Sequence, residues 1–276
     1  MEKGLLYICP TPIGNLEDIT LRTLKVLEEV DLVAAEDTRR TLKLLNRYNI
    51  KKPLTSYHEH NKKTKGQILV EKLKEGAKIA LVTDAGMPGI SDPGEDIIKL
   101  CIEENIDIIA LPGATAFTLA LVLSGLKTDK FVFEGFLPSK NRDRIKELER
   151  LKGEERTIIL YEAPHRMEAL LQDILTILGN RNISISRELT KIHEETFRGT
   201  VSEAIDWFKD TGPKGEFVIV LEGGAAPDED PYKDISVKEH LKKYIEEGMS
   251  KKDAVRRVAE ERNMPKNKVY KESLDI

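Results

Sequence analysis

Four short loops, most of them bearing glycine and proline, follow apolar runs in the first half of the chain. They are CPTPIGN at 9–15, AEDTRRT at 35–41, TDAGMPGISDPG at 83–94 and LPGATA at 111–116. A glycine-rich loop that joins a strand to a helix lets backbone amides approach a ligand closely. One such loop is weak evidence, because glycine and proline also end strands. Several on one edge of a sheet indicate a cleft for a cofactor.

The same loops exclude several common chemistries. The chain has no GxGxxG followed by an acidic residue about 20 positions later, which disfavours an ordinary dinucleotide site, and no GxxxxGK[ST]. GxSxG, the nucleophile elbow of α/β-hydrolases, is also missing. HEHN at 58–61 would place two histidines on one face of a strand, but no third ligand has matching spacing. No metal site is predicted.

The loops are positioned by alternating strands and helices. Strands are predicted at 5–9, 31–37, 77–84 and 106–113, and helices at 19–30, 38–48, 94–105 and 114–125. Strands that are apolar along their whole length indicate a parallel sheet covered on both faces. In such a sheet the loops after the strands share one edge, where open α/β sheets bind ligands.

The second half repeats this pattern less regularly. Strands are predicted at 131–138, 156–163, 183–189 and 215–224, with helices at 141–152, 165–178 and 200–210, which indicates a second α/β domain with some antiparallel pairing. We therefore expect an N-terminal domain at 1–126, a second domain at 127–224, an acidic linker at 225–235 and a basic helical, helix-turn-helix-like module at 236–276. Ser250 is a predicted N-cap in this module.

Composition bounds the remaining possibilities. The chain has 276 residues, 33% of them charged, and a net charge of -4, which is typical of a soluble protein and not of a nucleic-acid binder. That average hides -7 before residue 236 and +3 from 236 to 276. No apolar run approaches the length of a membrane span, and two cysteines cannot form a disulfide framework. A cytoplasmic protein without a membrane partner is expected.

Nine motifs in a fixed order resemble one family. They are PTPIGNLEDITLR, EDTRRT, YHEHN, VTDAGMPGISDPG, LPGA, FEGFLP, YEAPHR, RELTKIHEE and GEFVIVLEGG. The chain is similar over about residues 1–224 to the small-subunit ribosomal RNA (cytidine-2'-O)-methyltransferase I family, a branch of the tetrapyrrole-methylase-like, S-adenosylmethionine-dependent enzymes. The tail resembles the family's C-terminal helical domain.

The resemblance implies a fold, a cofactor and a substrate. The expected fold class is α/β, with two α/β domains of the tetrapyrrole methylase type, a cleft between them and a small C-terminal helical module. The expected cofactor is S-adenosyl-L-methionine, and the expected partners are 16S ribosomal RNA within the small ribosomal subunit and a second copy of the chain. Carried over to this sequence, donor binding is expected at Pro12, Asp84, Gly86, Met87, Ile90, Thr115, Ala116 and Glu162.

The implied reaction is an in-line attack of a cytidine 2'-hydroxyl, in the decoding region, on the donor methyl group. The protein must orient the reactants and accept the hydroxyl proton. Glu36 or Asp37 is the preferred base, with Arg39 as a further catalytic residue. Other polar candidates near the cleft are Arg40, His58, Glu59, Glu134, Glu188 and Lys191.

Several of these side chains have a second interpretation. Asp37 is also a predicted helix cap, with Arg39 and Arg40 on RNA phosphates or simply solvated. His165 and Arg166 contact a phosphate or cap a helix, and Tyr57 and Phe136 stack on a flipped nucleotide or belong to the core. Two alternative functions remain: a tetrapyrrole (precorrin-type) C-methyltransferase of the same fold, and a nucleic-acid-binding protein without catalysis.

Overall fold

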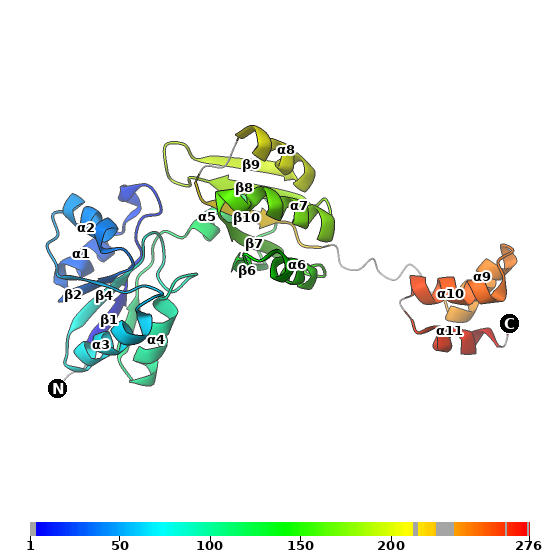
Figure 1. Ribbon diagram of the computed structural model, residues 1–276, viewed down its shortest axis with the longest axis horizontal. Coiled ribbons are helices and arrows are strands. Elements are labelled where there is room, and N and C mark those ends of the chain that lie inside the picture. The colour runs from blue at the N-terminus through cyan, green and yellow to red at the C-terminus, as the bar shows by residue number, and fades with distance from the viewer. Residues whose placement is uncertain (1–3, 212–214, 225–234, 263, 275) are drawn as a thin grey trace. The chain divides into compact units, whose positions relative to one another are not determined.

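The protein forms two compact units, Met1–Gly223 and Gly224–Ile276, in a computed structural model (Figure 1). The structure describes residues 4–211, 215–224, 235–262, 264–274 and 276. The predicted acidic linker therefore lies, apart from its last residue, outside the described residues. So does Asn263.

The first sheet is entirely parallel, with the strand order β3-β2-β4-β1-β5. Its strands are β1 (Leu5–Ile8), β2 (Leu32–Ala35), β3 (Leu54–Ser56), β4 (Lys78–Val82) and β5 (Asp107–Ala110). Its helices are η1 (Leu16–Asp18), α1 (Leu21–Glu29), α2 (Thr38–Arg47), α3 (Lys62–Lys74) and α4 (Gly94–Glu103).

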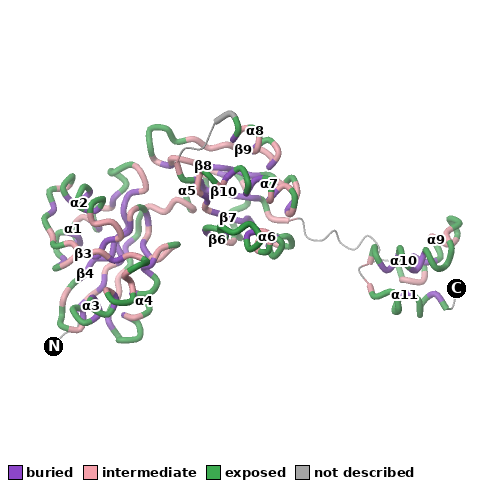
Figure 2. Tube along the Cα trace, in the orientation of Figure 1, coloured by how far each residue is buried: buried purple, intermediate pink, exposed green. Residues whose placement is uncertain are grey.

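Helices cover both faces of this sheet, as the apolar strands predict. One core cluster joins the sheet to α1 and α2 through Leu27 and Leu45. A second cluster joins the other face to α3 and α4 through Leu73 and Ile97. Figure 2 shows the buried residues concentrated along the strands. All four loops consequently leave the sheet at its carboxyl edge.

The second sheet is mixed, with the order β6-β7-β10-β8-β9, in which only β6 and β7 pair in parallel. Its strands are β6 (Phe131–Phe136), β7 (Thr157–Glu162), β8 (Asn182–Arg187), β9 (Glu195–Thr200) and β10 (Phe217–Leu221). The same half of the chain contains four helices: α6 (Asn141–Arg150), the short η2 (Pro164–Arg166), α7 (Met167–Ile177) and α8 (Val201–Thr211).

The two faces of the second sheet are covered by different parts of the chain. One face shares a core cluster with α6, α7 and α8. The other face packs against α5 (Ala116–Ser124), through Ala120 and Leu121. The sequence analysis places α5 within the domain 1–126, and its packing ties that segment to the second sheet.

Three elements lie where the sequence analysis expected none. The strand β3 has three residues, none of them fully buried. The helix α3 opens on a lysine-rich turn and contains Gly66, so its apolar face is short. The strand β9 is a polar edge strand without a fully buried residue. Apolar periodicity is too weak to detect any of the three.

The C-terminal unit consists of α9 (Val237–Glu246), α10 (Lys251–Glu261) and α11 (Lys266–Ser273) around its own core. Ser250 caps α10 by accepting from the N–H of Asp253, which confirms the predicted cap. Ser236 and Glu239 form a reciprocal capping box on α9. Within the described residues, no helix is long and apolar enough to cross a membrane.

Candidate functional site

The carboxyl edge of the first sheet brings the predicted loops together. Thr11 and Gly86 exchange two backbone hydrogen bonds, of 2.9 and 3.0 Å. The Thr11 hydroxyl also donates to the carbonyl of Thr83, at 3.0 Å. The loop after β1 is therefore joined to the loop after β4, which confirms that these segments share one edge.

Gly86 is required by the geometry of this junction. Its φ is +85°, in the region that favours glycine. A Cβ at this position would lie 3.3 Å from Ile13 Cγ2 and 3.5 Å from the carbonyl oxygen of Ala114. Three of the four loops thus meet within van der Waals distance of one glycine, whose bare backbone lets a ligand approach.

Glu36, at the end of β2, points toward the loop after β4. Its Oε2 accepts a hydrogen bond from the Thr83 hydroxyl at 2.8 Å and lies 3.4 Å from the backbone nitrogen of Asp84. In the part of the chain that the structure describes, no partner of Oε1 is found, and the residue is half-buried. Glu36 is therefore a fixed carboxylate with one oxygen available.

Asp37 is engaged by the start of α2. Its carboxylate accepts from the backbone and side-chain nitrogens of Arg39 at 2.8 to 3.1 Å, which confirms the predicted cap. The hydrogen bonds from Arg39 hold the pKa of Asp37 well below its usual range. A carboxylate held this firmly in its ionised form is a weak acceptor for a proton.

Asp84 links two of the loops. Its Oδ1 accepts from the backbone N–H of Asp37 at 3.0 Å, and its Oδ2 lies 3.1 Å from Arg40 Nη1. Partial burial raises the pKa of Asp84, and the neighbouring charge of Glu36 adds to this. Burial also raises the pKa of Asp92, which accepts from the N–H groups of Gly89 and Gly94.

One loop of the second sheet, between β8 and β9, contacts this edge. The Thr190 hydroxyl accepts from the backbone N–H of Asn15 at 2.9 Å, and a Cβ on Gly14 would lie 2.6 Å from Lys191. Glu188 and Thr190 both have positive φ, of 52° and 66°. Strained backbone of this kind is concentrated at functional sites.

Sequence reasoning missed Thr83 and Thr190 as members of the site. Thr83 follows β4 directly and contacts Glu36, while Thr190 lies in the RELTKIHEE motif. A polar residue at the end of an apolar strand is a signal that could have found Thr83. The positive φ of Thr190 has no counterpart in the sequence.

The remaining expected donor-binding residues lie on these loops or beside them. Pro12 is buried, whereas Met87, Ile90, Thr115 and Ala116 are half-buried. Met87 packs against the core of the first sheet. Thr115 is the N-cap residue of α5, yet its side chain makes no capping hydrogen bond.

Glu162 ends β7 and is fully buried. Its Oε1 accepts from the N–H of Ala163 at 2.8 Å and lies 3.1 Å from Arg166 Nε, whereas Oε2 has no partner in the described residues. Burial raises the pKa of Glu162. Arg166 also donates to the carbonyls of Leu137 and Pro138, so it fastens the loop after β6.

The aromatic and histidine candidates differ in their burial and in the elements on which they lie. Tyr57 is 1% exposed and donates its hydroxyl to the Pro93 carbonyl, so it belongs to the core and cannot stack on a nucleotide. Phe136 is 49% exposed and remains a candidate. His58 and His60 lie in a turn after β3, not on a strand. The described residues contain no group of three or more side chains suited to a metal.

The comparisons with known proteins agree with this geometry. Residues 5–205 match the family model of the tetrapyrrole (corrin/porphyrin) methylases. A Synechocystis protein named ribosomal RNA small subunit methyltransferase I is 49% identical over 99% of this chain and 98% of its own length. The chain belongs to this methyltransferase family. The resemblance drawn from the nine motifs and the expected fold are thereby confirmed.

Other relatives and solved structures extend the comparison. A Bacillus subtilis protein of the same name is 47% identical over 98% of this chain and 94% of its own length. A Thermotoga maritima protein of that name is 53% identical over 221 residues, 80% of this chain and 99% of its own length. The uroporphyrin-III C-methyltransferase of Thermus thermophilus, solved with S-adenyl homocysteine, has a TM-score of 0.58 at 15% identity, covering 81% of this chain and 98% of its own.

Proposed function

We propose that the protein transfers a methyl group from S-adenosyl-L-methionine to the ribose 2'-hydroxyl of a cytidine in 16S ribosomal RNA within the small ribosomal subunit. The names of the full-length relatives support ribosomal RNA as the substrate. The observation that carries the chemistry is the half-free carboxylate of Glu36, fixed by Thr83 at an edge where the loops converge. We retain domains at 1–126 and 127–224, and the module at 236–276, as the working division.

The residues at this edge fit the proposed cofactor. Its sulfonium centre supplies an electrophilic methyl group, and its remaining polar groups need hydrogen-bonding partners. Gly86 gives access to bare backbone, and Asp84 provides negative charge for an amine or ribose hydroxyls. The unpartnered Oε2 of buried Glu162 is a further acceptor. Pro12, Met87, Ile90, Thr115 and Ala116 supply the apolar and backbone contacts of this proposed site.

Glu36 is the acceptor for the hydroxyl proton in this mechanism. A ribose hydroxyl is a poor nucleophile until its proton is drawn away, and a carboxylate within hydrogen-bond reach does this. Both carboxylate oxygens of Asp37, the other candidate, already accept hydrogen bonds from Arg39 in the first turn of α2. Thr83 holds Glu36 through Oε2 and leaves Oε1 for the substrate. Asp37 therefore acts as a positioning residue.

Arg39 and Arg40 are placed to receive the RNA backbone. The Arg39 side chain is 87% exposed and that of Arg40 is 67% exposed, although both also pair with aspartates. Guanidinium groups bind phosphates in a bidentate manner and fix the register of a nucleic acid. Arg39 would thus position the target ribose.

The alternative function is C-methylation of a tetrapyrrole. Solved uroporphyrin-III C-methyltransferases resemble this chain, but their identities of 14–18% bear on the fold alone. The relatives named for ribosomal RNA are 47–49% identical over nearly the whole chain. The exposed arginines beside Glu36 also suit a polyanion better than a macrocycle.

We also propose a homodimer that acts in the cytoplasm. The helix α5 is apolar on nearly every side, which is typical of a helix covered all round. One side of α5 packs on the second sheet, yet Val122 and Leu119 of this helix are 75% and 37% exposed. Phe131, at the start of β6, is 40% exposed. A second copy is the occupant that the family resemblance implies. Analytical ultracentrifugation of wild type and Val122→Asp tests this, with dissociation expected for the variant.

One experiment separates the candidate functions. The purified protein is incubated with labelled methyl donor and offered small ribosomal subunits, naked ribosomal RNA or a tetrapyrrole precursor. We expect label in 2'-O-methylcytidine from the subunits. Label in the tetrapyrrole alone would contradict the proposal, and failure to bind the donor would remove both enzymatic functions.

A further inference from the structure

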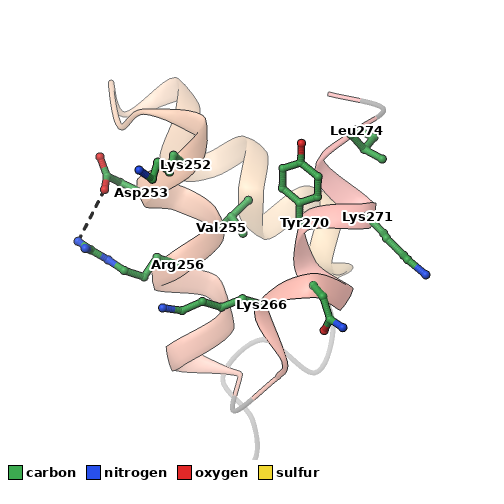
Figure 3. A pocket seen from close by; sticks show the side chains of 9 residues that line it. Lys252, Asp253, Val255, Arg256, Lys266, Tyr270, Lys271 and Leu274 are labelled. Atoms are coloured by element: carbon green, nitrogen blue, oxygen red, sulfur yellow. Dashed lines mark ion pairs between the residues drawn. The ribbon is translucent and has the colours of Figure 1, made fainter.

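The C-terminal unit carries a groove between α10 and α11 with a volume of about 630 Å³ (Figure 3). We infer that this groove binds a single-stranded segment of RNA, with phosphates on its cations and one unpaired base against Tyr270. The inference rests on the proposed function for the identity of the RNA. The groove itself is defined by residues of this unit alone.

One face of α11 forms a wall of the groove. It comprises Lys266, Asn267, Tyr270 and Lys271, followed by Leu274 at the C-cap. These positions recur at intervals of one and three residues, so they form a continuous stripe along the helix. Val269 and Ser273, on the opposite side, are buried in the core. The stripe is therefore a surface that the fold itself does not need.

The stripe exposes two large side chains with apolar surface as well as its lysines. Tyr270 is 55% exposed and Leu274 is 62% exposed. Figure 3 shows the Tyr270 ring standing at the rim of the groove, with Val255 of α10 between the two helices. An exposed aromatic ring beside an apolar floor is a platform on which a base can stack.

Cations surround this platform from both helices. Lys252 and Arg256 come from α10, and Lys266 and Lys271 come from α11, against a single acid, Asp253. Arg256 lies 3.6 Å from Asp253, and both side chains are largely exposed. Within the described residues the three lysines have no ion-pair partner. Their charge is therefore available to a polyanion.

Two acidic residues of the unit are engaged away from the groove. Glu239 is held in the capping box at the start of α9. Glu261 accepts from the Tyr244 hydroxyl and pairs with Arg257, at 3.0 Å. These two acids are engaged outside the groove, whose own lining has four cations against one acid. The groove stays positive although residues 236–276 carry a net charge of only +3.

Single-stranded RNA fits this arrangement better than a duplex does. The major groove of an RNA duplex is deep and narrow and does not admit a helix, whereas unpaired bases stack on aromatic side chains. Successive phosphates along a strand, at an axial rise of roughly 3.4 Å, can reach cations on both walls. Asn267 adds a donor and an acceptor for a base edge.

The test measures binding of the full chain to a labelled single-stranded RNA oligonucleotide by fluorescence anisotropy across a salt series. The double variant Lys252→Gln, Lys266→Gln removes two groove charges, and Lys242→Gln, Lys243→Gln removes two exposed charges from α9 as a matched control. Loss of two phosphate contacts should lower the slope of log K against log salt by about 1.4. The control should leave the slope near that of wild type.

Tyr270 variants test stacking independently of charge. Tyr270→Ala should weaken binding about tenfold without changing the salt slope, and Tyr270→Phe should restore it. Circular dichroism melts show that each variant is folded, and calorimetry with S-adenosylhomocysteine reports on donor binding. If the wild-type protein does not bind S-adenosylhomocysteine, the proposed function is contradicted, whereas the groove inference still stands.

Three results would overturn the inference. One is RNA binding by the groove variants that matches wild type in affinity and slope. Another is tighter binding of duplex DNA than of single-stranded RNA, which would make α11 a duplex-reading helix. An acidic peptide that displaces the RNA with higher affinity would likewise assign the groove to a protein partner.

Discussion

The carboxyl edge of the first sheet and the groove of the C-terminal unit are built in opposite ways. At the edge, backbone hydrogen bonds between Thr11 and Gly86 and fixed carboxylates such as Glu36 define the surface. In the groove, exposed lysines and Tyr270 define it. A small cofactor of definite shape needs a rigid backbone, whereas a flexible polyanion is held by charge and stacking. The two regions should therefore fail in different ways when altered.

The largest expected effect is on catalysis at the edge. Glu36→Gln removes the proton acceptor while keeping the bond from Thr83, so kcat should fall by about 10² to 10⁴. Donor affinity, measured by calorimetry, should change by only a few fold. The matched control is Asp37→Asn, which keeps a good N-cap and should cost far less activity. Equal losses in the two variants would remove the distinction between base and positioning residue.

Removal of residues 232–276 should affect RNA binding and spare the edge. The C-terminal unit has a core of its own, so the first unit keeps its packing without it. We expect binding to small subunits to weaken about tenfold or more and its salt dependence to decrease. An equal loss of donor affinity, measured in the same preparation, would show that the unit supports the edge structurally.

Gly86→Ala tests the rigidity of the edge. A side chain at a φ of +85° costs about 1–2 kcal/mol, and its Cβ would press on Ile13. We expect this loss in chemical denaturation, together with weaker donor binding. Gly153→Ala is the control, since a Cβ there has nothing within 4 Å. A Gly86→Ala protein as stable as the control would contradict the assigned role of the loop junction.

The smallest effect is a dependence of stability on pH at Glu162. Its folded pKa is raised by burial, so ionisation costs stability as pH rises from the unfolded value through the folded one. Glu162→Gln should therefore raise the melting temperature at neutral pH, by a small amount. The gain should shrink as pH falls through the folded pKa and vanish below the unfolded one. A variant less stable than wild type at neutral pH would mean that the bond to Arg166 outweighs desolvation.

The sequence predicts the local features of this molecule well. Asp37 and Ser250 were recognisable as caps because each stands directly before a helical pattern. The continuous apolar strands predicted a parallel sheet. A parallel sheet in turn predicted that the loops after its strands share the carboxyl edge. These features depend on residues close together in the chain.

Long-range features were not predictable in the same way. The contact of Glu36 with Thr83 spans 47 positions, and that of Asn15 with Thr190 spans 175. The sequence of an apolar helix such as α5 does not indicate which sheet the helix covers. A tyrosine such as Tyr57 is equally suited to a core or to a binding surface. Tertiary packing decides each of these, so only the structure reveals them.

The most direct test of the central claim locates the transferred methyl group. Small ribosomal subunits are treated with wild-type protein and labelled donor, and the 16S RNA is digested to nucleosides and, separately, hydrolysed with alkali. We predict label in 2'-O-methylcytidine within an alkali-resistant dinucleotide, and almost none with Glu36→Gln. Label on a base atom, or in alkali-sensitive mononucleotides, would contradict the account.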